Sequence, residues 1–378
     1  VVEARRRGIP ILIRAEALAE LLVGRRSVAV AGTHGKTTTS AMLSWALREL
    51  GSDPSFVIGS QIMTLGISAH HGSGENFIVE ADESDGSFTH YRPEGAIVTN
   101  LELDHVDNFK DLDAVRATFE DFLKSVGSYL VLCGDDDGVA TLPIPASLEK
   151  ITYGFNDESF DLHLSEASLT GKSSSAKLAW RGRAIGVLRL SIAGRHNLLN
   201  AAATVATLIK LGHDPHSAIS SLENFHGTSR RFERKGMAKG VLVIDDYGHH
   251  PTEIRATLVA ARKLLEEREG GRLIAIFQPH RYSRTVAFLD EFANSLSAAD
   301  FTYLLDIYAA SEKPIPGVSS KDIVARISPG RAKYQPDQGL LFHELTETLR
   351  EGDLVITLGA GDVTKVGPQL LSALIDRS

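Results

Sequence analysis

The segment Gly32-Thr-His-Gly-Lys-Thr-Thr38 is the feature of this sequence that most restricts how the chain can fold. The apolar run Val28–Ala31 precedes it, and a helical stretch from Thr37 to Leu50 follows it. This order predicts a buried strand, a tight glycine-bearing turn and a helix. In such a unit the backbone N–H groups of the turn and the N-terminus of the helix surround a polyphosphate. We therefore expect an α/β fold with a phosphate site at the end of its first strand.

The residue types inside this segment suit ATP phosphates and a magnesium ion. The glycines let the backbone pass close to phosphate oxygens, Lys36 supplies a positive charge for the terminal phosphates, and the hydroxyl of Thr37 can bind magnesium. The spacing is tighter than in the usual phosphate-loop motif, because Val30 stands where the first glycine would be expected. The alternative is an ordinary turn with an incidental lysine. The predicted ATP-binding residues are Gly32, Thr33, His34, Gly35, Lys36, Thr37 and Thr38.

The region after this unit predicts a mainly parallel sheet flanked by helices, because short apolar runs alternate with helical stretches. A helical stretch lies between Asp113 and Lys124, and helices are expected at Asn197–Leu211 and His216–Leu222. The segment from Ile151 to Ile192 has alternating apolar positions and predicts small antiparallel strands attached to the main sheet. Further buried strands are expected at Phe77–Glu80, Ala96–Asn100 and Tyr129–Cys133.

A second α/β domain, resembling a Rossmann fold, is expected after the basic junction Gly227–Lys235. Long helical stretches at Pro251–Glu267 and Thr285–Ser297 separate the first three of its strands. The four predicted strands are Val241–Asp245, Leu273–Phe277, Phe301–Ile307 and Leu354–Leu358. The chain therefore reads as a central P-loop-type ATPase domain followed by a C-terminal Rossmann-like domain.

Composition narrows the class of protein further. A net charge of −8 argues against a nucleic-acid partner, because binding a phosphate backbone needs a basic surface. No apolar run approaches the roughly 18 residues that a membrane span needs, so no membrane partner is expected. Cys133 is the only cysteine, which excludes an internal disulfide, and its apolar surroundings predict a buried strand residue. With no secretory signal peptide recognised, we expect a cytoplasmic protein, and its oligomeric state stays open.

Six motifs follow one another along the chain: Ala31-Gly-Thr-His-Gly-Lys-Thr-Thr-Thr39, Glu80-Ala-Asp-Glu-Ser-Asp85, Asn100-Leu-Glu-Leu-Asp-His-Val-Asp107, Gly194-Arg-His-Asn197, Asp245-Asp-Tyr-Gly-His-His-Pro-Thr-Glu253 and Phe277-Gln-Pro-His-Arg-Tyr-Ser-Arg284. Together they resemble the Mur ligase family, which forms amide bonds in peptidoglycan precursor synthesis. The resemblance covers nearly the whole chain, and the last two motifs point to the branch that joins L-alanine to the carboxylate of UDP-N-acetylmuramate.

The resemblance implies an ATP-dependent ligase that activates a carboxylate as an acyl phosphate, with Lys36, His105, Arg231 and His249 in catalytic roles. Glu80 and His105 resemble the family's metal-associated carboxylate and histidine, and with Thr37 they would bind Mg²⁺ or Mn²⁺. The alternatives are a solvated acidic loop around Glu80 and a structural histidine at position 105.

For the nucleotide, the resemblance assigns Asn197 and Asn200 to adenine or ribose recognition and Asp246 to the nucleotide site. Asn197 could instead cap the helix that it opens. Arg231 resembles the arginine that reaches from the domain junction to the γ-phosphate, and the alternative is a solvated basic linker.

For the incoming amino acid, the resemblance assigns His249, Arg281 and Arg284. Two arginines three residues apart at a helix start can hold a carboxylate by paired hydrogen bonds. Surface charges at a helix start are the alternative. His249 would orient the amino acid or accept its ammonium proton, and the sequence does not decide between these roles.

The resemblance also implies three domains, at residues 1–25, 26–226 and 227–378. The first would be the last strand and helix of an N-terminal domain that holds the UDP-sugar, so we expect a shortened or incomplete sequence. Two alternatives to L-alanine ligation are a ligase of the same family that recycles a tripeptide, and a non-catalytic ATP-binding module.

Overall fold

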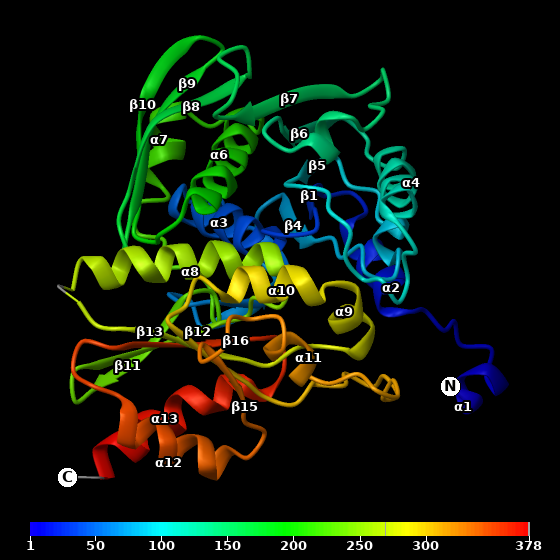
Figure 1. Ribbon diagram of the computed structural model, residues 1–378. Coiled ribbons are helices and arrows are strands. Elements are labelled where there is room, and N and C mark those ends of the chain that lie inside the picture. The colour runs from blue at the N-terminus through cyan, green and yellow to red at the C-terminus, as the bar shows by residue number, and fades with distance from the viewer. Residues whose placement is uncertain (269, 377–378) are drawn as a thin grey trace.

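The first part of the chain builds one ten-stranded sheet in the order β10-β9-β8-β7-β6-β5-β1-β4-β2-β3. The computed structural model describes residues 1–268 and 270–376, and Figure 1 shows this sheet in the upper half of the molecule. The strands are β1 (Arg26–Ala31), β2 (Ser55–Ile62), β3 (Ile67–His70), β4 (Asn76–Glu80), β5 (Gly95–Val98), β6 (Tyr129–Cys133), β7 (Glu149–Gly154), β8 (Leu162–Leu169), β9 (Ser174–Trp180) and β10 (Arg183–Leu190).

The pairing of these strands confirms the mainly parallel sheet with antiparallel additions. β2, β4, β1, β5, β6, β7 and β8 pair in parallel, whereas β9 and β10 continue the sheet antiparallel. The hairpin of β2 and β3 was not predicted, because polar residues and Gly59 interrupt its apolar pattern.

Helices cover both faces of this sheet, since alternate residues of its central strands point to opposite faces. Val28 and Val30 of β1 pack in one cluster with α3 and α6, while Ala29 and Ala31 pack in the other with α2 and α4. The helices of this part are α1 (Val2–Arg6), α2 (Arg14–Leu22), α3 (Lys36–Glu49), η1 (Ser87–His90), α4 (Leu112–Leu123), α5 (Asp137–Ala140), α6 (Arg195–Lys210) and α7 (Pro215–Ser220).

The second part builds a six-stranded sheet in the order β11-β12-β16-β13-β14-β15. All of its pairs are parallel except that of β11 with β12. Its strands are β11 (Glu233–Ala238), β12 (Val241–Asp246), β13 (Leu273–Phe277), β14 (Phe301–Leu304), β15 (Ala332–Tyr334) and β16 (Leu354–Leu358). Its helices are α8 (Pro251–Glu266), α9 (Tyr282–Ala287), α10 (Leu289–Leu296), α11 (Lys321–Val324), α12 (Gln338–Thr348), η2 (Asp362–Lys365) and α13 (Val366–Asp376).

The helices of the second sheet also form two layers. Residues of α8, α10 and α11 pack on one face, and residues of α12 and α13 pack on the other. Figure 1 shows α8 running along the boundary between the two sheets, so its N-terminus is well placed to contact the first part of the chain.

Three predicted elements differ from the structure. The helix expected at Thr285–Ser297 is divided into α9 and α10, because Phe288 leaves the helical conformation with φ −125° and ψ 30°. The strand expected at Phe301–Ile307 ends at Leu304, where its last register partner on β13 also ends. The strand expected within Val1–Val23 is absent among the described residues, where Ile9–Ile13 has no neighbouring strand to complete its backbone hydrogen bonds.

No helix in the part of the chain that the structure describes has both the length and the apolar character needed to cross a membrane.

Candidate active site

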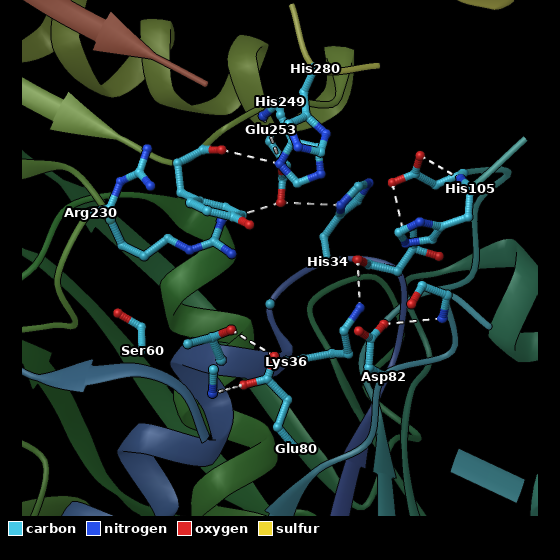
Figure 2. A pocket seen from close by; sticks show the side chains of 18 of the residues that line it. His34, Lys36, Ser60, Glu80, Asp82, His105, Arg230, His249, Glu253 and His280 are labelled. Atoms are coloured by element: carbon cyan, nitrogen blue, oxygen red, sulfur yellow. Dashed lines mark hydrogen bonds and ion pairs between the residues drawn. The ribbon is translucent and has the colours of Figure 1, made fainter. Parts of the chain in front are cut away.

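A cleft of about 460 Å³ lies between the two sheets and is lined by residues of both. Figure 2 shows His249, Glu253 and His280 on one side of it and Lys36, Glu80 and Asp82 on the other, with His34 between them. The predicted residues Thr37, His105, Arg231, Arg281 and Arg284 line the same cleft. The fold therefore brings together residues that are up to about 250 positions apart, which fits a site built at strand ends.

The phosphate loop has a backbone shape that only glycine takes up without strain at two positions. Gly32 has φ 135°, and a Cβ atom there would lie 2.0 Å from Oγ1 of Thr99. Gly35 has φ 81° and stands at the N-cap of α3. The loop therefore presents the N-terminus of a long helix toward the cleft, as expected for a phosphate site.

Lys36 lies folded over its own loop and faces a buried carboxylate. Its Nζ donates hydrogen bonds to the carbonyl oxygens of Gly32 (2.6 Å) and Thr33 (3.1 Å), and it lies 2.8 Å from Oε2 of Glu83. Burial raises the pKa of Glu83 to about 7, although Lys36 opposes this change. Glu83 was not predicted as a site residue, although it belongs to the acidic motif at residues 80–85. Its ion pair with Lys36 is what places it in the site.

Possible metal ligands form two groups beside the loop, one around Glu80 and one around His105. Glu80, at the end of β4, accepts hydrogen bonds from the hydroxyl of Thr37 (2.9 Å) and from the backbone N–H of Gly59 (2.6 Å). The ligand atoms of Asp82, Glu83 and His105 lie within 4.8 Å of one another. Burial lowers the pKa of His105, so its imidazole is neutral and able to bind a metal ion. This donor set suits a hard divalent cation such as Mg²⁺ or Mn²⁺.

The backbone of His105 is held in an unusual conformation. Its φ of 50° is unusual for a residue other than glycine, and its backbone N–H donates to Oδ1 of Asp104 at 2.6 Å. Such conformations persist where the surroundings fix them, and they are frequent at functional sites. Asp104 was not among the predicted residues.

A second cavity, of about 480 Å³, adjoins the loop and holds the residues predicted for the nucleotide. Asn197, Asn200, Arg231 and Asp246 all line it. Nδ2 of Asn200 donates to Oδ1 of Asn197 at 3.3 Å. The N-cap of α6 is Gly194, so the alternative that Asn197 caps this helix is wrong.

Arg231 and Asp246 link this cavity to the domain junction. Nη1 of Arg231 donates to Oε1 of Glu253 at 3.3 Å, and Arg231 lines both cavities. The carboxylate of Asp246 is buried and accepts hydrogen bonds from the backbone N–H groups of Phe232 and Gly248, each at 2.7 Å. Arg231 thus lines the cleft and is hydrogen-bonded to Glu253, so it is not part of a solvated linker.

The residues predicted for the amino acid sit on the opposite wall. Burial lowers the pKa of His249 to about 3, so its imidazole is neutral. Its Nδ1 lies 3.1 Å from the carbonyl oxygen of Tyr247, which requires a proton on Nδ1 and leaves the lone pair on Nε2. His249 therefore has a free lone pair on Nε2 that can accept a hydrogen bond, but its low pKa makes it a weak base.

The two predicted arginines pair with carboxylates of the first sheet's loops. Arg284 is only 3% exposed, and its Nε donates to Oδ1 of Asp104 at 2.8 Å. Arg281 forms an ion pair with Asp107. Burial of Arg284 excludes the alternative that it is a surface charge, and both pairs join the second part of the chain to the first.

Comparisons with known proteins cover both parts of the chain. Residues 30–208 match the family model described as Mur ligase middle domain, and residues 230–361 match the model described as Mur ligase, glutamate ligase domain. The chain is 44% identical over 391 residues to a UDP-N-acetylmuramate-L-alanine ligase of Mycobacteroides abscessus, which covers 100% of this chain and 80% of the relative.

Several solved structures are similar over nearly the whole chain, and two of them are ligases with at least 25% identity. The UDP-N-acetylmuramate-alanine ligase MurC from Thermotoga maritima has a TM-score of 0.82 and 28% identity, over 100% of this chain and 82% of that one. A murein peptide ligase from Psychrobacter arcticus has a TM-score of 0.72 and 25% identity, over 98% of this chain and 82% of that one.

Proposed function

Because the chain belongs to the Mur ligase family, we propose that it joins L-alanine to the carboxylate of UDP-N-acetylmuramate, using ATP, in peptidoglycan precursor synthesis. The observation that carries this proposal is the cleft in which Lys36 of the phosphate loop faces His249, Arg281 and Arg284 across the domain boundary. Such an enzyme would act in the cytoplasm, where ATP is available.

The reaction needs a carboxylate to be activated before an amine can attack it. Transfer of the γ-phosphoryl group from ATP to the carboxylate oxygen gives an acyl phosphate and releases ADP. The amine of L-alanine then forms the amide bond, and inorganic phosphate leaves. Lys36 would neutralise charge on the transferred group, and Arg231, which lines both cavities, would reach the γ-phosphate from the junction.

The residues beside the phosphate loop fit a divalent cation. We assign Thr37, Glu80 and His105 to Mg²⁺ or Mn²⁺, and we add Asp82 and Glu83 to this set because their ligand atoms converge with that of His105. When bound, the cation would offset the negative charge of the phosphates and of the substrate carboxylate.

The opposite wall suits an amino acid. Arg281 and Arg284 would hold its carboxylate once Asp107 and Asp104 share or release them, which leaves the amine free to attack. Nε2 of the neutral His249 would accept a hydrogen bond from the amino group, so we assign His249 to orienting the amine for attack. Asn197, Asn200 and Asp246 would hold the nucleoside part of ATP in the adjoining cavity.

To test the proposal, the full-length protein is incubated with ATP, Mg²⁺ and UDP-N-acetylmuramate, and the inorganic phosphate formed from ATP is measured in the presence and absence of L-alanine. We expect release that requires both substrates and that falls by at least about a thousandfold in Lys36→Ala, because the charge on the transferred group is then uncompensated. ADP binding without any release of phosphate would contradict the proposal and favour a non-catalytic ATP-binding module.

The tripeptide-recycling alternative is tested in the same assay. L-alanine is replaced by the tripeptide that begins with L-alanine, at equal concentration. We expect L-alanine to give the higher kcat/KM. A preference for the tripeptide would replace the proposed substrate while leaving the ligase chemistry intact.

A further inference from the structure

Glu253 has a largely buried carboxylate, 11% exposed, that no step above uses, yet five nitrogen atoms surround it. Two are backbone N–H groups at the start of α8, from His249 (3.1 Å) and His250 (3.4 Å). Three belong to side chains: Nδ1 of His34 (3.4 Å), Nη1 of Arg231 (3.3 Å) and Nδ1 of His249 (3.5 Å). Figure 2 shows Glu253 between His34 and His249.

The two oxygens of Glu253 have different partners. Oε2 accepts the two backbone N–H groups, which is the ordinary role of a glutamate at the third position of a helix. Oε1 meets His34 and Arg231, and neither contact contributes to capping. Burial opposes ionisation, yet the positive groups nearby hold the pKa of Glu253 well below its usual value. The carboxylate is therefore charged where it faces the cleft.

His34 makes this contact an interdomain one. It lies in the phosphate loop two positions before Lys36, and its Nε2 lies 3.5 Å from Oε2 of Glu102. Glu102 follows β5 and accepts a hydrogen bond from the hydroxyl of Thr252 at 2.8 Å. Two carboxylates thus hold the imidazole of His34 between the phosphate loop and the start of α8.

We propose that Glu253 is a positioning residue that, by binding His34 across the domain boundary, fixes Arg231 and His249 relative to the phosphate loop. One carboxylate thus contacts three groups: His34 of the phosphate loop, Arg231 at the cleft and the imidazole of His249. The packing of α8 on the loop and the positions of Arg231 and His249 therefore depend on it. Reacting groups displaced by about 1 Å can lose about a hundredfold in rate, so such a hub would act on kcat. This inference rests on the proposed ligase function.

The experiment compares Glu253→Gln, His34→Gln and the double variant in the full ligase assay. In Glu253→Gln an amide oxygen still accepts the backbone N–H groups of α8, while the negative charge is lost. We expect kcat to fall about 10- to 100-fold in each single variant, and the double variant to be no slower than the slower single one, because the contact between His34 and Glu253 is lost in all three. The KM for L-alanine should change less than about threefold.

Two controls separate positioning from folding and from nucleotide binding. Glu266→Gln removes a charge at the exposed end of the same helix, and its kcat should equal that of the wild type. ADP binding, measured by calorimetry, should weaken less than about threefold in Glu253→Gln, because Asn197, Asn200 and Asp246 are unchanged. If Glu253→Gln does not fold, His34→Gln leaves the helix cap intact and carries the test alone.

The assay separates failure of the positioning role from failure of the proposed ligase function. A wild type that releases no phosphate overturns the ligase proposal. An active wild type whose Glu253→Gln or His34→Gln variant keeps its kcat overturns the positioning role, and so do losses that multiply in the double variant.

Discussion

The histidine of the phosphate loop is a charged group held between two carboxylates. Burial alone would lower the pKa of His34, but Glu102 and Glu253 raise it to about 9. The ring of His250 packs beside it, with the two ring centroids 4.7 Å apart. His34 is therefore protonated near neutral pH, whereas His249 on the other side of Glu253 is neutral.

The raised pKa of His34 predicts how the stability of the fold depends on pH. The pKa of His34 is higher in the folded state than its ordinary value of 6.5, so its contribution is complete below pH 6.5 and is lost as pH rises through about 9. We expect the free energy of unfolding to fall by up to about 3 kcal/mol over this window, since one pKa unit corresponds to about 1.4 kcal/mol. Urea unfolding at a series of pH values measures this change. His34→Gln is the control, and an equal fall in that variant would contradict the assignment.

The phosphate loop is the element whose shape depends most on individual glycines. Gly32→Ala should abolish ADP binding, because its Cβ atom would meet Oγ1 of Thr99 at 2.0 Å in a backbone with φ 135°. Gly51→Ala is the matched control, since Gly51 also has a positive φ, of 80°, but nothing lies within 4 Å of the added atom. That variant should lose about 1 kcal/mol of stability and still bind ADP, as calorimetry would show. Full ADP binding by Gly32→Ala would show that the loop can move.

Helix α8 has a comparable role on the other side of the cleft. Its N-cap residue His250 and its first-turn residues Thr252 and Glu253 make the contacts with His34 and Glu102. The start of α8 therefore both caps the helix and contacts the phosphate loop. Substitutions in its first turn should weaken the cap and this contact together.

The two halves of the molecule are joined by ion pairs that differ in burial. Arg284 and Asp104 are 3% and 4% exposed, whereas the side chains of Arg281 and Asp107 are 31% and 23% exposed. Asp104→Asn would leave the charge of Arg284 buried without its partner, so we expect a loss of about 3 to 5 kcal/mol in the stability of the docked state. Asp107→Asn should cost less than about 1 kcal/mol. Denaturant unfolding of both variants checks this order, and equal losses would contradict it.

Much of the fold follows from patterns that are local in the sequence. Continuous apolar runs predicted β1, β4, β6, β12, β13 and β16, because strands buried on both faces tolerate few polar residues. The half-exposed strands β2 and β11 carry a weaker pattern, and they were not predicted. The break between α9 and α10 at Phe288 also has no local signal, since neither glycine nor proline marks it.

The sequence by itself determined the phosphate loop, the family and most residues of the cleft, because glycine conformations and strand-ending motifs are encoded within a few neighbouring positions. Only the tertiary structure decided the charges and partners of these residues. His34 is charged and His249 is neutral because of the carboxylates and the burial that surround each of them. Glu253 was not singled out from the sequence, and its contact with His34 exists only because α8 meets the phosphate loop. The physical reason is that pKa values and ion pairs depend on groups that are distant in the sequence and are brought together by folding.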